Sequence, residues 1–237
     1  MVTRILIMAG GTGGHVFPAL AVAQQLREQG VQVTWMGTRH GLESKIVPEA
    51  GFPMEWVLVS GLRGKGISSW LLAPFKLLVA LIQALVIIMR CRPMAVLGMG
   101  GFVSGPGGLM TWLLNKPLLI HEQNAIAGLT NSKLALFATK VMEAFPGSLP
   151  ERHHPLHTGN PVRDEIAALD HPDERLKDRQ GPLHLLILGG SLGAKALNEI
   201  VPQAIKQLPA GQRPRVWHQT GANHSNETHE QYQSLGL

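Results

Sequence analysis

The stretch RILIMAGGTGGHVFPAL, residues 4–20, decides the fold of this chain of 237 residues. Its first part, residues 4–8, is a short apolar run of the kind that forms a buried parallel strand. Glycines follow at positions 10, 11, 13 and 14, and beyond them apolar residues recur on one helical face as far as Gln29. A strand, a glycine loop and a helix in this order leave backbone N–H groups at a helix N-terminus, where a phosphate or diphosphate is the natural ligand.

Strands and helices are expected to alternate along the rest of the chain. The patterns predict strands over residues 31–36, 54–59, 94–97, 117–120, 139–142, 183–188 and 215–219. They predict helices over residues 42–49, 69–90, 106–114, 127–138 and 223–234, and one more ending near 206. This alternation is typical of an α/β protein with a parallel, doubly wound sheet.

The opening pattern occurs a second time. Residues 186–193, LILGGSLG, repeat the apolar strand and the Gly-Gly-[Thr/Ser]-x-Gly loop of residues 6–14. Between the two copies, prolines, charges and histidines crowd residues 143–182, as in a connection between domains. We therefore expect two related domains, 1–162 and 163–237. The second holds 75 residues, fewer than the ~100–200 of a complete domain, and is expected to be incomplete.

A third glycine loop, residues 98–108, follows the strand predicted at 94–97, so three such loops are expected at the same end of a sheet. A nicotinamide oxidoreductase is disfavoured because the first loop lacks the G-x-G-x-x-G spacing and no acidic residue ends the second strand at 35–38. The P-loop motif G-x-x-x-x-G-K-[ST] is absent, and GLRGKG at 61–66 resembles it only superficially.

The single cysteine, Cys91, excludes an intramolecular disulfide framework and a cysteine-based zinc site. The trio His153, His154 and His157 lacks carboxylate or cysteine partners in a metal-binding pattern, so no metal is expected. The first apolar run is too short for the core of a signal peptide, which predicts a cytosolic protein.

All of the net charge of +5 belongs to one segment. Residues 56–121 contain six Lys or Arg and no Asp or Glu, which gives +6 there and −1 over the rest of the chain. The same segment is the most apolar, and a basic, apolar surface favours an anionic membrane over nucleic acid. We expect a helix over 67–92 to lie on that membrane, with a patch formed by Arg63, Lys65, Trp70, Leu71, Phe75, Lys76 and Val79 and with Arg90 also facing the headgroups.

Two alternatives exist for this helix. One is a core helix whose ends are solvated. The other is a bilayer span, because residues 71–89 come near the ~20 residues that a span needs. Pro74, Lys76 and Gln83 interrupt that stretch, which disfavours the span.

Polar candidates follow the predicted loops. His15 comes directly after the first glycine loop, where the helix dipole is expected to lower its pKa and keep it neutral. It is then either a general base or a structural, hydrogen-bonded histidine. Residues 121–124, HEQN, offer either hydroxyl-recognising groups or a structural network. Arg163 is a candidate either for pairing with an anion or for holding the hinge between the domains.

Six motifs together resemble those of glycosyltransferase family 28, in particular its members that build the lipid-linked precursor of peptidoglycan. They are GGTGGHVFP at 10–18, SGLRGKG at 60–66, GMGGFVSGP at 98–106, HEQN at 121–124, GNPVR at 159–163 and GGSLGA at 189–194. The resemblance runs along the whole chain. It implies a GT-B fold of two Rossmann-like domains, the second incomplete in this chain, with the active site between them.

The resemblance also implies an inverting transfer that needs no metal and no cofactor. N-acetylglucosamine would pass from UDP-N-acetylglucosamine to the C4 hydroxyl of the N-acetylmuramyl unit of lipid I, undecaprenyl-pyrophosphoryl-MurNAc-pentapeptide, giving lipid II. The enzyme would be peripheral, on the cytoplasmic face of the cell inner membrane. It would serve the peptidoglycan synthesis on which cell shape and cell division depend.

Site residues follow from the same resemblance. His15 is the implied base, and the implied donor-binding residues are Thr12, Gly13, Gly14, Asn124, Arg163 and Ser191. The implied acceptor-diphosphate residues are Gly11, Gly100, Gly101 and Ser104. The chain resembles the first two-thirds of such an enzyme, so we expect weak donor binding and essentially no transfer by this chain alone. The alternative function is a non-catalytic membrane-surface module, which has no use for a UDP-sugar.

Overall fold

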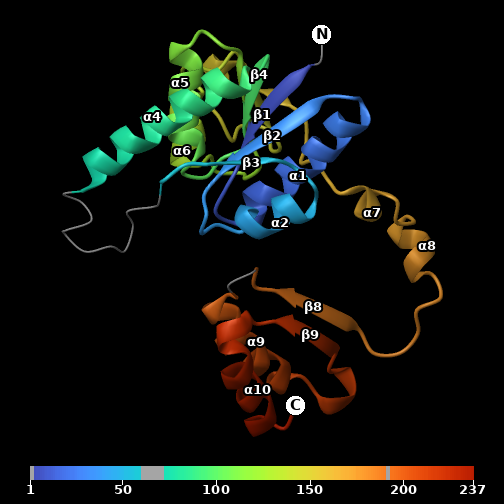
Figure 1. Ribbon diagram of the computed structural model, residues 1–237. Helices are drawn as coiled ribbons and strands as arrows, with labels where there is room; N and C mark the ends of the chain where they lie inside the picture. Colours follow the sequence, from blue (N-terminus) through green and yellow to red (C-terminus); the bar gives the residue numbers. More distant parts are fainter. Residues whose placement is uncertain (1–2, 60–71, 191–192) are drawn as a thin grey trace. The chain divides into compact units, whose positions relative to one another are not determined.

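The computed structural model describes residues 3–59, 72–190 and 193–237 (Figure 1). It divides into two compact units, Met1–Ala168 and Leu169–Leu237, and the domain boundary predicted at 162/163 lies a few residues before this division. The motif at 60–66 is outside the described residues. So are five of the predicted site residues, namely Arg63, Lys65, Trp70, Leu71 and Ser191.

The first unit contains a seven-stranded sheet in which every pair of neighbours is parallel. Its strands are β1 (Arg4–Met8), β2 (Gln32–Gly37), β3 (Met54–Trp56), β4 (Ala95–Gly98), β5 (Leu118–Glu122), β6 (Lys140–Glu143) and β7 (Leu156–His157). Their order, β3-β2-β1-β4-β5-β6-β7, reverses direction between β1 and β4. Doubly wound proteins bind ligands at such a reversal, beyond the carboxyl ends of the strands. The predicted parallel, doubly wound sheet is confirmed.

Helices supply a hydrophobic layer on each face of this sheet. α1 (Gly13–Glu28) and α2 (Glu43–Glu49) contribute to one buried cluster. α4 (Ala73–Cys91), α5 (Ser104–Leu113) and α6 (Leu129–Leu134) contribute to the other. The 3-10 turn η1 (Glu151–His153) and the short helix α7 (Asp164–Ala167) complete the unit.

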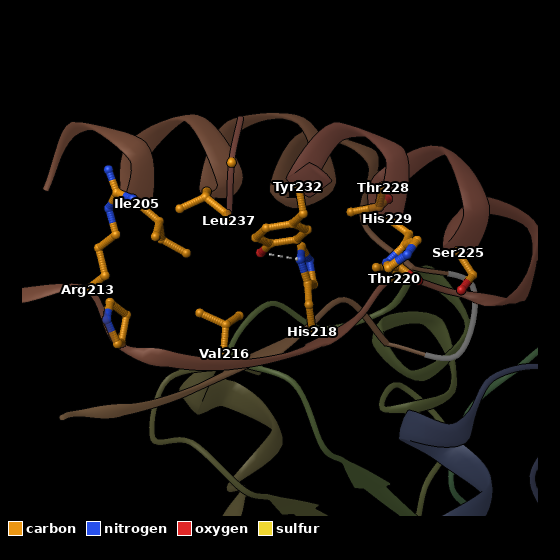
Figure 2. A pocket seen from close by; sticks show the side chains of 12 residues that line it. Ile205, Arg213, Val216, His218, Thr220, Ser225, Thr228, His229, Tyr232 and Leu237 are labelled. Carbon is orange, nitrogen blue, oxygen red and sulfur yellow. Dashed lines mark hydrogen bonds between the residues drawn. The ribbon is translucent and has the colours of Figure 1, made fainter. Parts of the chain in front are cut away.

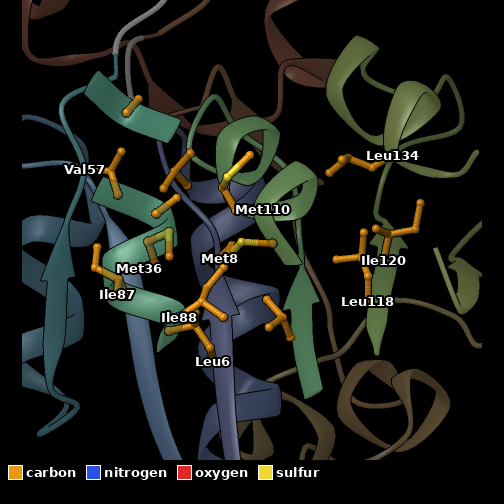
Figure 3. Packing of buried hydrophobic residues seen from close by; sticks show 14 of the residues in the cluster. Leu6, Met8, Met36, Val57, Ile87, Ile88, Met110, Leu118, Ile120 and Leu134 are labelled. Carbon is orange, nitrogen blue, oxygen red and sulfur yellow. The ribbon is translucent and has the colours of Figure 1, made fainter. Parts of the chain in front are cut away.

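β1 is buried on both faces. Leu6 and Met8 belong to the cluster under α4 and α5, whereas Ile7 and Ala9 belong to the cluster under α1, and all four are fully buried. This division follows from the strand geometry, because successive side chains point to opposite faces. Figure 3 shows Leu6 and Met8 among the side chains that α4 and α5 direct at the sheet.

The second unit is built on two parallel strands, β8 (His184–Leu188) and β9 (Arg215–Gln219), paired in register from His184↔Arg215 to Leu188↔Gln219. Its helices are α8 (Pro172–Leu176), α9 (Lys195–Gln207) and α10 (Ser225–Ser234), with 3-10 turns η2 (Ala210–Gln212) and η3 (Ala222–His224). β8, its glycine loop and α9 repeat the order of β1, its loop and α1, as the internal repeat predicted.

Several expectations are corrected. The glycine loop at 189–193 follows β8, which belongs to a separate two-stranded sheet, so only the loops at 10–14 and 98–108 share one sheet edge. The region 143–182, expected to be a connection, contributes β7 to the first sheet, where it pairs with β6. β3 ends at Trp56 instead of residue 59, because its partner β2 ends opposite it at Gly37.

The predicted helix over 127–138 is also too long, since α6 covers only Leu129–Leu134. Its start is delayed because the N–H of Gly128 donates to the carboxylate of Glu122, 3.2 Å away. That contact holds residue 128 as the extended cap of the helix.

Candidate functional site

The glycine loop at residues 10–14, called the first loop from here on, and the loop at 98–108, called the second loop, meet at the switch between β1 and β4. Gly10 and Gly101 are in backbone contact, because a Cβ atom at position 101 would collide with the Gly10 carbonyl. Gly100, with φ +100°, and Gly101, with φ +84°, occupy the left-handed region that favours glycine. The two loops therefore pack backbone to backbone, which only residues without side chains allow.

His15 sits in the first turn of α1, against the second loop. A Cβ atom at Gly100 would overlap the His15 imidazole ring, so the ring lies directly on the glycine. The imidazole Nδ1 is 3.2 Å from the Thr12 hydroxyl. This places the ring of the predicted base at the edge where the two loops meet.

Burial lowers the pKa of His15 below its usual 6.5, and the nearby Glu122 carboxylate opposes this shift by raising it. The ring is therefore neutral at pH 7, as predicted, but the leading cause is burial and not the expected helix dipole. If Nδ1–H donates to Thr12, Nε2 is left as the acceptor that a general base requires.

A buried carboxylate that the sequence did not single out lies beneath the first loop. The N–H of Gly11 donates to Glu43 Oε2 at 2.9 Å, and Glu43 Oε1 accepts from the Thr38 N–H at 2.9 Å and the Thr38 hydroxyl at 2.7 Å. Gly11, predicted to meet the acceptor diphosphate, thus has its N–H engaged within the protein. The remaining N–H groups at this end of α1 belong to Gly13 and Gly14, which have no acceptor within a helix.

Ser104 in the second loop is fully buried. Its hydroxyl contacts the carbonyl oxygens of Met8 and Gly100, at 3.0 and 2.9 Å. Since one hydroxyl has one proton, the two carbonyls share it. The side chain of this predicted acceptor residue therefore ties the loop to β1 in this structure.

The segment HEQN at 121–124 forms a hydrogen-bonded network at the end of β5. Fully buried Glu122 accepts from the Asn124 backbone and side chain at 3.0 and 2.9 Å and from Asn131 Nδ2 at 2.9 Å. His121 Nε2 lies 3.0 Å from the Gly159 carbonyl, and burial lowers the His121 pKa. For His121 and Glu122 the structural alternative is what the structure shows. Asn124 is exposed, with its amide nitrogen fixed by Glu122.

Arg163 is exposed and leans over α1. Its guanidinium carbon is 5.4 Å from the centre of the Phe17 ring, in cation–π geometry. The neighbouring Asp164 accepts from Gln25 Nε2 at 3.2 Å. Both contacts hold the end of the first unit to α1, which favours the hinge-holding alternative and leaves the guanidinium edge accessible.

The second unit contains a cavity of about 540 Å³ that the sequence did not predict. It lies between β9 and the helices α9 and α10 (Figure 2). His218 Nδ1 is 3.1 Å from the Tyr232 hydroxyl, and burial lowers the His218 pKa and raises that of Tyr232. His218 lies on β9 between exposed neighbours and Tyr232 lies on α10, so no motif in the sequence brought the two together.

The membrane patch can be followed only on α4. Phe75 is 70% exposed and Val79 42% exposed, whereas Ala80, Ala84, Ile87 and Ile88 pack on the sheet. Arg90, expected to face lipid headgroups, forms an ion pair with Glu55. Within the described residues, α4 is the one helix long and apolar enough to cross a membrane, by length and composition alone.

A groove of about 370 Å³ runs between residues 57–59 and α4. Its lining is mainly apolar, with Arg39, His40 and Lys76 also bordering it. Among the described residues no group of three or more His, Cys, Asp or Glu is arranged to hold a metal ion. Cys91 is a free thiol whose pKa is raised by burial and by Glu55.

Comparisons with known proteins agree with this architecture. Residues 5–143 match the glycosyltransferase family 28 N-terminal domain, and residues 184–237 match the family 28 C-terminal domain. The chain is 59% and 56% identical, over its full length, to proteins of Nitrosococcus oceani and Alkalilimnicola ehrlichii. Both are named UDP-N-acetylglucosamine–N-acetylmuramyl-(pentapeptide) pyrophosphoryl-undecaprenol N-acetylglucosamine transferase. The chain spans 66% of the length of each.

Solved structures give the same result. The crystal structure of Acinetobacter baumannii MurG matches with a TM-score of 0.72 and 41% identity, over 99% of this chain and 64% of that one. A UDP-GlcNAc 2-epimerase from Neisseria meningitidis matches with a TM-score of 0.63 at 12% identity, over 99% of this chain and 69% of that one, which shows a shared fold only. The sheet topology, the two domain matches and the identities lead to one conclusion: this chain belongs to glycosyltransferase family 28 and has its α/β GT-B fold.

Proposed function

We propose that this protein serves the transfer of N-acetylglucosamine from UDP-N-acetylglucosamine to the C4 hydroxyl of the N-acetylmuramyl unit of lipid I, giving lipid II. The observation that carries the proposal is the neutral imidazole of His15 resting on Gly100 where two glycine loops meet. The names of the relatives described above supply the substrates. A base beside a phosphate-binding loop is what activation of a sugar hydroxyl next to a diphosphate requires.

In the proposed reaction, His15 Nε2 accepts the proton of the acceptor C4 hydroxyl. The hydroxyl oxygen attacks the anomeric carbon of the donor, and the bond from that carbon to the UDP oxygen breaks with inversion. UDP leaves with the bonding electron pair. When His15 Nδ1–H donates to the Thr12 hydroxyl, that contact holds the ring in the tautomer that this step needs.

Diphosphate binding is assigned to the loop backbones. The N–H groups of Gly13 and Gly14 lie at the positive end of α1, which stabilises an anion there. Gly100 and Gly101 of the adjoining second loop are proposed for the acceptor diphosphate. The residues proposed for the donor are Thr12, Gly13, Gly14, Asn124, Arg163 and Ser191. The accessible edge of Arg163 suits a phosphate or a carbonyl oxygen.

The exposed face of α4 supports a peripheral place on the cytoplasmic face of an anionic membrane. Phe75 and Val79 offer apolar contact, and Lys76 lies beside them on the same helix. This face would bring the active site to a lipid-linked acceptor. The same observation favours the second candidate function, a non-catalytic membrane-surface module.

Donor binding separates the two functions. We expect weak, saturable binding when the chain is titrated with UDP-N-acetylglucosamine. Calorimetry or amide shifts in NMR spectra would detect this binding. Extension of the chain with the remaining third of a relative should then give lipid II from lipid I and labelled donor. If neither binding nor transfer is found while vesicle binding persists, the membrane module is the better description.

A further inference from the structure

Glu43 is a fully buried carboxylate that the proposed reaction does not use. It begins α2, yet it reaches back to the loop after β1. Through its two oxygens it joins Gly11 of the first glycine loop to Thr38 in the loop after β2. Its three hydrogen bonds measure 2.7 to 2.9 Å, the usual range for N–H···O and O–H···O bonds.

Three glycines make room for this side chain. A Cβ atom at Gly10 would come within 2.6 Å of Glu43 Oε1, and one at Gly37 within 2.8 Å of Glu43 Cγ. A Cβ atom at Gly41 would collide with the carboxylate itself. Glycine at these positions is therefore explained by the space that Glu43 occupies, independently of any bound phosphate.

We infer that Glu43 is a positioning residue for the first glycine loop: its carboxylate takes the Gly11 N–H and thereby confines a bound phosphate to the Gly13–Gly14 end of α1. The negative charge beside Gly11 also repels a phosphate from that position. Only the measurement of turnover rests on the proposed function. The loop geometry does not depend on the reaction.

The contacts continue from Glu43 to His15. Glu43 occupies the space where a Cβ atom of Gly10 would lie, and the Gly10 backbone contacts Gly101. Gly100, the neighbour of Gly101, supports the His15 ring. A shift of the first loop therefore moves the surface on which the imidazole rests, although Glu43 touches neither His15 nor the proposed substrate site.

The role requires a carboxylate specifically. One oxygen accepts the Gly11 N–H and the other accepts the Thr38 N–H, so both must be acceptors. Glutamine has nearly the same shape but offers only one oxygen, and its amide group would face a backbone donor. Glu43→Gln therefore keeps the shape of the side chain but removes one of the two links in the bridge from Gly11 through Glu43 to Thr38.

Glu143 provides a matched control within the same sheet. It is 4% exposed, and it accepts from the Gly147 and Leu149 N–H groups, each at 3.2 Å, and from the Ser148 hydroxyl at 3.0 Å. It is a buried carboxylate holding a loop at the end of β6, separated from the first glycine loop by β4 and β5. Glu143→Gln should therefore cost stability without affecting Gly11.

The experiment compares the wild type, Glu43→Gln and Glu143→Gln by amide NMR spectroscopy. In the wild type the Gly11 amide should be protected from hydrogen exchange, and inorganic pyrophosphate should shift the Gly13 and Gly14 amides but not Gly11. In Glu43→Gln, Gly11 protection should fall about tenfold or more, and pyrophosphate should also shift Gly11. Equal Gly11 protection in both variants, or equal loss in both, would overturn the inference.

Thr38→Val is a milder variant in case Glu43→Gln does not fold. It removes one hydroxyl donor to Glu43 and keeps the backbone bond, so Gly11 protection should fall by a smaller factor, about twofold to fivefold. Unchanged Gly11 protection in a folded Thr38→Val protein would contradict the inference that Glu43 links Thr38 to Gly11. In the extended chain, Glu43→Gln should lower kcat more than it raises KM for the donor. If the wild type binds no UDP-N-acetylglucosamine while the Gly11 results hold, the proposed function fails and the positioning role stands.

Discussion

The imidazole of His15 rests on the Cα atom of Gly100, so that no side chain fits at position 100 without displacing the ring. Gly100→Ala should therefore combine two penalties. The first is backbone strain at φ +100°, which is roughly 1–2 kcal/mol for a residue with a Cβ atom. The second is displacement of His15. Urea unfolding should show the loss of stability, and the imidazole resonances should report the ring.

Gly147→Ala separates the two penalties. Gly147 has φ +83°, but a Cβ atom there would meet nothing within 4 Å. The Gly147→Ala protein should be destabilised only by the backbone strain, and its His15 resonances should stay in place. Equal effects of both substitutions on those resonances would show that the His15–Gly100 contact is unimportant.

His15→Ala, made in the chain extended to the length of its relatives, should lower kcat by ~10²–10⁴, the usual contribution of a general base. His153→Ala serves as the control, because His153 belongs to the histidine trio for which no metal binding is expected. A loss below about threefold, far under the range for a general base, would return His15 to a structural role.

The pH dependence follows from the lowered pKa of His15. Burial lowers that pKa below 6.5, so the folded protein binds this proton less readily than the unfolded chain does. As pH falls below 6.5, His15 therefore makes a negative contribution to the free energy of unfolding. The rising limb of kcat/KM should lie below pH 6.5 and should be absent from His15→Ala. A rising limb centred above pH 6.5 would contradict a buried, neutral base.

Glu143 should stabilise the first unit in a pH-dependent way. Burial alone would raise its pKa, but the hydrogen bonds from Leu149, Ser148 and Gly147 outweigh burial and lower the pKa below 4.5. A lowered carboxyl pKa contributes stability above the unfolded value, and that stability is lost as pH falls through the folded value. Glu143→Gln should destabilise at pH 7 by ~1–3 kcal/mol. The difference from wild type should narrow in urea titrations below pH 4.5. A constant difference would rule out the charge as its cause.

Binding to anionic vesicles should depend on α4. Lys76→Glu should weaken co-sedimentation about fivefold or more, and added salt should weaken wild-type binding because exposed charges are screened. Phe75→Ser should weaken binding at every salt concentration, because it removes apolar contact. Lys206→Glu, on the second unit, is the charge control. Salt-insensitive binding that survives Lys76→Glu would show that the surface-patch interpretation is wrong.

Local pattern was enough to predict most elements. β1 and β9 have the predicted bounds, because each is a short apolar or alternating run between clear turn signals. β7 was not predictable, since two exposed residues carry no periodicity, and its position depends on pairing with β6. The late start of α6 at Leu129 goes with a hydrogen bond from Gly128 to Glu122, which no local rule reveals.

The site was only partly predictable for the same reason. His15 and the glycine loops are contiguous motifs, so the sequence placed them correctly at the end of β1. Glu43 occupies the first turn of a helix, where an acidic residue is ordinary. Only the parallel pairing of β1 with β2 brings it beneath Gly11, 32 positions earlier. The signal that could have indicated it is the pair Gly37 and Gly41 around an otherwise unremarkable turn.

Because Leu6 and Met8 face one hydrophobic layer while Ile7 and Ala9 face the other, the two layers share a single strand. Loss of either helical layer exposes one face of β1, and the remaining layer then loses the sheet surface against which it packs. The first unit should consequently unfold as one cooperative block, with the β1 amides exchanging at the rate of global opening. A substitution that destabilises the α4 layer should therefore also destabilise the α1 layer, where the first glycine loop begins.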